Sequence, residues 1–176
     1  AAANGFTALM LSAQNAHDLC LRALLKAGAA VDVARPNGFT ALIDACEFGH
    51  DLCVQELLKA GAAVDKQGPQ DATALIVACQ SGHEQCARAL LKAQADPNKA
   101  NNNGFVALMH AAQNGHDLCL RALIEAKAEI DKAGPQDFTA LMFASSNGAE
   151  QCARALIEAK ANIEATEEDN WTAIMF

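Results

Sequence analysis

Hydrophobic residues recur along the chain in blocks that repeat every 33 residues. The tripeptide Thr-Ala-Leu begins at Thr7, Thr40, Thr73 and Thr139. Variants of it, Val-Ala-Leu and Thr-Ala-Ile, occupy the equivalent residues 106–108 and 172–174. A fixed period of this length indicates a stack of identical small units, because each unit is too small to bury its own apolar face. The pattern therefore predicts an all-α repeat solenoid with one core along its length.

Each unit is expected to begin with a turn and to continue into a short helix. In the unit 35–67 the turn signal is Pro36-Asn37-Gly38, because Asn and Gly tolerate positive φ. The hydroxyl of Thr40 can then cap a helix that includes residues 41–46. The expected units of this single repeat domain, 1–176, are residues 2–34, 35–67, 68–100, 101–133 and 134–166, with a partial sixth unit at 167–176.

A second helix is expected in each unit after a Gly-His step such as Gly49-His50. Asp51 places negative charge at the start of this helix, where the helix dipole favours it. The helix should end at Gly61, as helices commonly end at a glycine. Three units carry a different residue at that position, and we expect their helix ends to be strained or less tightly turned; these residues are Gln94, Lys127 and Lys160.

The whole pattern resembles the ankyrin repeat. The fourth unit reads Asn-Gly-Phe-Val-Ala-Leu at 103–108, then Ala-Ala-Gln-Asn-Gly-His at 111–116. The Thr-Pro-Leu-His that is usual in the family has become Thr-Ala-Leu-Met or Thr-Ala-Leu-Ile here. The resemblance covers essentially the whole chain. It implies pairs of helices, joined by β-hairpin-like loops, in a non-enzymatic protein that binds a protein partner with its concave face and loop tips.

The first helix of each unit has one face that varies between copies. The varying positions are those equivalent to 11, 14 and 15, which lie at i, i+3 and i+4 and so share one side of a helix. We expect this face to contact the partner. A tolerant, half-exposed face without a selected partner is the alternative. The candidate binding residues on it are Asp44, Glu47, Phe48, Gln80, His110, Asn114 and Phe143.

An aromatic residue precedes the Thr in nearly every unit. These residues are Phe6, Phe39, Phe105, Phe138 and Trp171. Large rings at loop tips are typical anchors in protein interfaces, so they are candidate binding residues too. The equally weighted alternative is that each ring packs between successive loops. Ala72 interrupts the series, which predicts a gap in the row of rings.

Composition narrows the classes of function. The 13 basic residues against 21 acidic ones give a net charge of −8, and no basic stripe suited to nucleic acid is visible. No apolar run is long enough for a membrane span. The seven cysteines follow the repeat, so we expect them to be reduced and buried, in an intracellular protein of the cytoplasm or nucleus.

Candidate chemistry is sparse. Cys46, His50 and Cys53 have a spacing that superficially resembles a zinc site, but their repeat positions favour core cysteines and a loop histidine. No nucleophile or phosphate-binding motif occurs. We therefore expect no enzyme activity, cofactor, metal or small-molecule substrate. Two alternatives remain open: a generic, engineered or library-derived scaffold without an evolved partner, and a thiol-redox or metal-binding protein.

Overall fold

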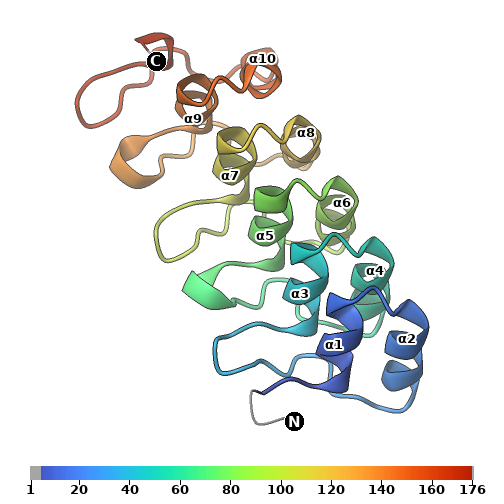
Figure 1. Ribbon diagram of the computed structural model, residues 1–176. Coiled ribbons are helices and arrows are strands. Elements are labelled where there is room, and N and C mark those ends of the chain that lie inside the picture. Colours follow the sequence, from blue (N-terminus) through green and yellow to red (C-terminus); the bar gives the residue numbers. More distant parts are fainter. Residues whose placement is uncertain (1–4, 176) are drawn as a thin grey trace.

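The computed structural model describes residues 5–175, which form a stack of helix pairs (Figure 1). One row contains the first helices α1 (Ala8–Gln14), α3 (Ala41–Glu47), α5 (Ala74–Ser81), α7 (Ala107–Gln113) and α9 (Ala140–Ser146). The other contains the second helices α2 (Asp18–Lys26), α4 (Asp51–Lys59), α6 (Glu84–Lys92), α8 (Asp117–Glu125) and α10 (Glu150–Glu158). Short 3-10 helices occur at η1 (Pro69–Asp71), η2 (Pro135–Asp137) and η3 (Ala173–Met175). The predicted all-α repeat solenoid is confirmed. None of these helices is long and apolar enough to span a bilayer.

Threonine hydroxyls start the first helices. The Oγ1 of Thr40 accepts a hydrogen bond from the Ile43 amide at 3.3 Å, and Thr7 caps α1 in the same way at 3.2 Å. Each such cap stabilises a helix by about 1 kcal/mol. Val106 replaces the Thr before α7, and that helix has no side-chain cap. The predicted capping by Thr7 and Thr40 is confirmed.

The loops between units share one closing hydrogen bond. In the second unit the Arg35 amide donates to the Phe39 carbonyl at 2.9 Å, and in the third the Gly68 amide donates to Ala72 at 2.9 Å. The residue before each Thr therefore has its backbone fixed whatever its side chain. In Figure 1 the loops extend to one side of the row of first helices, away from the second helices.

The core is shared between neighbouring units. Residues at one second-helix position, Leu57, Leu90, Leu123 and Leu156, are fully buried. Their counterpart Leu24 in α2 is only partly buried. No helix pair lies ahead of α1 and α2 within residues 5–175, so one side of that pair is uncovered. The expectation that all seven cysteines are buried is wrong for the same reason: Cys20 on α2 is exposed, and the other six are buried.

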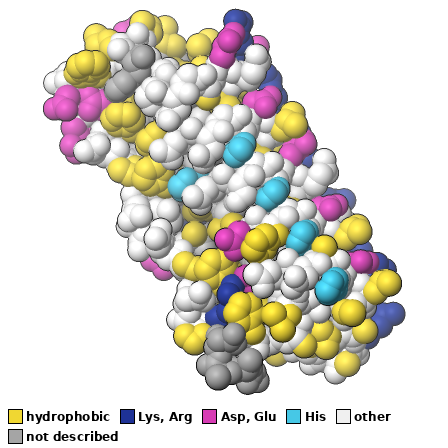
Figure 2. Space-filling view, in the orientation of Figure 1, with side chains coloured by type: hydrophobic (Ala, Val, Ile, Leu, Met, Phe, Trp, Pro, Cys, Tyr) yellow, Lys and Arg dark blue, Asp and Glu magenta, His cyan; other side chains and the backbone are white. Residues whose placement is uncertain are grey.

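A ladder of histidines connects the second, third and fourth units each to the unit before it. The His83 Nε2 lies 3.1 Å from the carbonyl oxygen of Glu47, and His50 and His116 make the same contact with Gln14 and Gln80. Glycine is needed beside the ring, because a Cβ at Gly49 would lie only 2.5 Å from Nδ1 of His83. Figure 2 shows most of the histidine side chains in a row along the length of the molecule. The Gly-His step is thus part of the scaffold.

The second helices end in left-handed backbone whether or not glycine is present. Gly61 has φ of 84° there, and the non-glycine residues have nearly the same values: 66° at Gln94, 61° at Lys127 and 66° at Lys160. Left-handed geometry is unfavourable for a residue with a Cβ. These three helix ends therefore turn as the glycine ends do, in a geometry that is unfavourable for their side chains, and the expected strain stays a prediction.

Replacing Lys127 with glycine should relieve this strain. We expect Lys127→Gly to raise the free energy of unfolding by about 0.5–1 kcal/mol in urea denaturation, after allowing for the greater freedom of glycine in the unfolded chain. Gly61→Ala is the matched control and should lower it by about 1 kcal/mol. A Cβ at Gly61 meets no atom within 4 Å, so only backbone strain acts there. A Lys127→Gly protein no more stable than the parent would contradict the argument.

The histidine ladder has a missing rung in the fifth unit, where Ala149 stands in place of His. Its backbone angles, φ −79° and ψ 69°, are close to those of His116. We expect Ala149→His to add a bond to the Gln113 carbonyl and to raise the free energy of unfolding by about 1 kcal/mol. His116→Ala, which removes an existing rung, should lower it by at least as much. Equal stability of the Ala149→His variant and the parent protein would show that the rung does not form.

Candidate functional site

The candidate site is the face formed by the loops and first helices, which is the concave face in the sense used above. Of the predicted binding residues, Glu47, Phe48, Gln80 and Asn114 are exposed there. The loop rings of Phe6, Phe39, Phe105 and Phe138 are partly buried and pack against the core, and Trp171 is 49% exposed. Two predicted residues lie elsewhere: Asp44 is fully buried, and Phe143 is 9% exposed.

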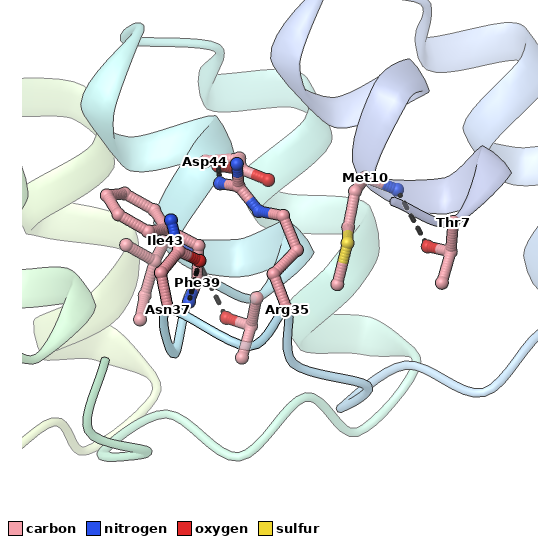
Figure 3. A network of polar contacts seen from close by, with 8 residues as sticks. Thr7, Met10, Arg35, Asn37, Phe39, Ile43 and Asp44 are labelled. Atoms are coloured by element: carbon pink, nitrogen blue, oxygen red, sulfur yellow. Dashed lines mark hydrogen bonds and ion pairs between the residues drawn. The ribbon is translucent and has the colours of Figure 1, made fainter. Parts of the chain in front are cut away.

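Asp44 forms a buried ion pair with Arg35 (Figure 3). The Arg35 guanidinium carbon lies 4.3 Å from the Phe6 ring centroid and 4.5 Å from that of Phe39. Rings from two successive loops therefore flank one cation, an arrangement in which each ring attracts the charge. This placement corrects the expectation that Asp44 lies on the exposed helix face, because the loop side chains cover it.

The environment of Asp44 opposes its charge. Burial raises the pKa of this carboxyl to about 6, although the adjacent Arg35 acts in the opposite direction and Glu47 adds to the rise. Its Oδ2 has no hydrogen-bond partner within the part of the chain that the structure describes. A buried ion pair with an unsatisfied oxygen contributes little to stability relative to an apolar pair of similar volume.

A second cluster of rings fills the equivalent space in the fourth and fifth units. The Phe143 ring centroid lies 5.3 Å from Phe105 and 5.3 Å from Phe138. His110 stacks on Phe105 at 5.0 Å between centroids. Burial lowers the pKa of His110, and its Nε2 has no hydrogen-bond partner among residues 5–175. The ring is therefore neutral at physiological pH and behaves as part of an aromatic cluster.

The loop residues of two successive units determine how deeply the first-helix position of Phe143, equivalent to Leu11, is buried. Phe143 lies against the ring of its own loop, Phe138, and against that of the loop before it, Phe105. Leu11, with no loop ahead of Phe6 among residues 5–175, is 48% exposed. The placement of Phe143 on an exposed face was wrong for this reason. Loop rings thus pack between units, as one of the two sequence interpretations proposed.

The gap predicted at Ala72 is present as a hollow of about 500 Å³ in the concave face. Phe39 lines it from the preceding loop, and Ala72 and Gln70 line it from their own. Further side chains come from the ends of three successive first helices: Glu47, Gln80 and Asn114. The hollow therefore combines an aromatic ring with groups that accept hydrogen bonds, and it spans three units.

Arg35 and Gln70 are the important residues that sequence reasoning missed. In the loop tips and first helices, which are the segments equivalent to residues 35–47, Arg35 is the only Lys or Arg, and Asp44 occupies a position that is uncharged in the other complete units. Two opposite charges that appear together in one copy are a usable signal of pairing. Gln70 adopts φ of 55°, and its carbonyl accepts a bond from the Asn102 amide of the next loop at 3.0 Å. The Gln136 carbonyl accepts the same bond from the Glu168 amide at 3.3 Å, so the contact accompanies the repeated Pro-Gln-Asp sequence at 69–71 and 135–137.

The cysteines and histidines do not assemble into a metal site. No group of three or more His, Cys, Asp or Glu side chains within residues 5–175 could hold a metal ion. Cys46 and Cys53 are buried, and the His50 Nε2 contacts the Gln14 carbonyl. Burial raises the pKa of Cys53 and of Cys152 to about 11, which keeps these thiols protonated at neutral pH.

The raised pKa of Asp44 makes the stability of the protein depend on pH. A carboxyl with a folded pKa of about 6 and an unfolded pKa near 3.9 stabilises the fold below about pH 4, and this stabilisation is lost as the pH rises through 6. Between pH 4.5 and 7 we expect a loss of about 2 kcal/mol in the free energy of unfolding from this group. Asp44→Asn should lack that component when both proteins are unfolded with urea at the two pH values. Identical pH profiles would contradict the burial argument.

Comparison with known families agrees with this architecture. The family described as "Ankyrin repeats (3 copies)" matches residues 1–68 and 52–134, and "Ankyrin repeat" matches residues 136–168. None of the curated proteins matches the chain. Ankyrin repeats are generally protein–protein interaction modules, and proteins of the family are typically non-enzymatic. Since these matches extend over most of its length, the chain belongs to the ankyrin repeat family.

Proposed function

We propose that this protein is a non-enzymatic interaction module that binds a protein partner on its concave face and loop tips. The observation that carries the proposal is the hollow at Ala72, because it is bordered by exposed side chains from three units. A surface built from several units suits a partner larger than a small molecule. An open hollow lined by both apolar and polar side chains is also typical of interface positions that receive a partner side chain.

Hydrogen bonds from two histidines fix the backbone at two of the residues that line this hollow. The Glu47 and Gln80 carbonyls accept the bonds from His83 and His116, each at 3.1 Å. Their side chains therefore start from fixed points, and little conformational freedom of the backbone is lost when a partner binds. Phe48, which directly follows Glu47 and is 45% exposed, and Trp171, which is 49% exposed, supply further apolar contact area.

The test is affinity capture from an extract of the organism's own cells, with captured proteins quantified by mass spectrometry. The variant Gln80→Arg/Asn114→Arg places two bulky charges in the hollow, and we expect it to lower capture of the partner by at least about tenfold. The matched control Gln55→Arg/Gln85→Arg makes the same charge change on the exposed side of α4 and α6. Equal capture by both variants, with unchanged circular dichroism, would refute binding at the concave face.

A further inference from the structure

Charge is distributed unequally between the two sides of the solenoid. The loop tips and first helices, which are the segments equivalent to residues 35–47, contain the acidic residues Asp44, Glu47, Asp71, Asp137, Glu167, Glu168 and Asp169. Their only Lys or Arg is Arg35, which is buried in its ion pair with Asp44. The other 12 basic residues lie on the second helices or in the segments that follow them. In Figure 2 most Lys and Arg side chains accordingly appear along the edge where the second helices lie in Figure 1.

Two hollows of similar size illustrate this contrast. The one between α4 and α6 measures about 510 Å³ and is lined by Lys59, Arg88 and Lys92 among others. The one at Ala72 on the concave face measures about 500 Å³, and its only charged lining residue is Glu47. The Glu47 carboxylate makes no ion pair or hydrogen bond with the residues that the structure describes. Its negative charge is therefore available to a partner.

The other polar groups of the hollow also favour a ligand that donates hydrogen bonds. The amide nitrogen of Asn114 donates one of its two hydrogens to the His110 carbonyl at 2.9 Å, and its Oδ1 can accept a bond from a ligand. Phe39 also lines the hollow; the Arg35 guanidinium carbon already lies 4.5 Å from the centroid of its ring, so only the opposite face can attract a second cation. Ala72 and Val77 supply apolar surface against which the methylene groups of a long side chain can pack.

We propose that the hollow at Ala72 receives a Lys or Arg side chain from an extended, basic segment of the protein partner. The inference rests on the proposed function and adds the chemistry of the partner to it. The cation lies between the Glu47 carboxylate and the Phe39 ring, and the flanking basic residues of the segment lie along the acidic loop tips at Asp71 and Asp137. An acidic or purely apolar segment lacks the charge that this surface complements.

Fluorescence anisotropy with a defined probe tests this directly. The probe is a labelled decapeptide of alternating Arg and Ser, compared with one of alternating Glu and Ser. The full chain should bind the Arg peptide and leave the Glu peptide unbound in 20 mM NaCl. Affinity for the Arg peptide should fall as the salt is raised to 200 mM, because exposed charges are then screened.

Three variants locate the binding. Glu47→Gln should weaken binding of the Arg peptide by about fivefold, the scale of one partly exposed charge pair. Glu164→Gln is the matched control: it removes the same charge from an exposed residue outside the concave face and should change affinity less than about twofold. Ala72→Phe should weaken binding by about tenfold, because it fills the hollow. Phe occupies this loop position in other units, so the fold should be retained.

The outcomes separate this inference from the proposed function. If Glu47→Gln and Glu164→Gln weaken binding of the Arg peptide equally, the attraction is a diffuse effect of net charge. If Ala72→Phe binds the Arg peptide as tightly as the parent chain does, the hollow is not used. Either result overturns the inference. If the Arg peptide fails to bind the parent chain while Gln80→Arg/Asn114→Arg still abolishes capture of a cellular partner, the concave face is a binding surface whose partner is not basic there. If neither binding is seen, both proposals fail.

Discussion

No unit of this protein can bury its own apolar face or satisfy all of its own polar groups, and the rest of the structure follows from that constraint. The fully buried Leu90 belongs to a core that runs through successive units, and its counterpart Leu24 in the first pair is only partly buried. Polar contacts obey the same rule. The Asp65 carboxylate accepts a bond from the Asp96 amide 31 residues later, and the His83 ring reaches the Glu47 carbonyl 36 residues earlier. Stability is therefore a sum over interfaces between neighbours.

The same constraint explains which parts of the structure were predictable. A strict period carries the contacts that recur at every interface, so the helix pairs, the Thr caps and the buried cysteines beyond α2 could be inferred from one sequence. Contacts that differ from copy to copy could not. Whether Asp44 or Phe143 is exposed depends on loop residues in two units, about 5 to 38 positions away. A helical face drawn from i, i+3 and i+4 contains no information about those loops.

The loop aromatics illustrate how one position serves two purposes. Phe105 stacks on His110 in its own unit and lies 5.3 Å from Phe143 in the next, so the ring is part of an interface between units. Its remaining exposed edge still belongs to the concave face. Where the aromatic is absent, at Ala72, the backbone hydrogen bond of the loop is retained at 2.9 Å and only the ring is missing. A hollow can therefore form at this position without loss of the loop that frames it.

The contacts between units use the backbone of residues whose side chains are available for binding a partner. His83 and His116 hold the main chain at Glu47 and Gln80 through carbonyl oxygens, which every residue possesses. The side chains at those positions are consequently free to vary without affecting the ladder. The second unit departs from this independence, since the charge of Asp44 requires Arg35, and Arg35 lies between Phe6 and Phe39. A change at any of these four residues alters the others, whereas the Glu47 side chain makes no hydrogen bond or ion pair with the residues that the structure describes and affects the cluster only through its charge. Residues such as Glu47 and Gln80 can thus change the specificity of the hollow at little cost in stability, whereas Phe39, which lines the hollow and also contacts Arg35, can change only together with the charged cluster.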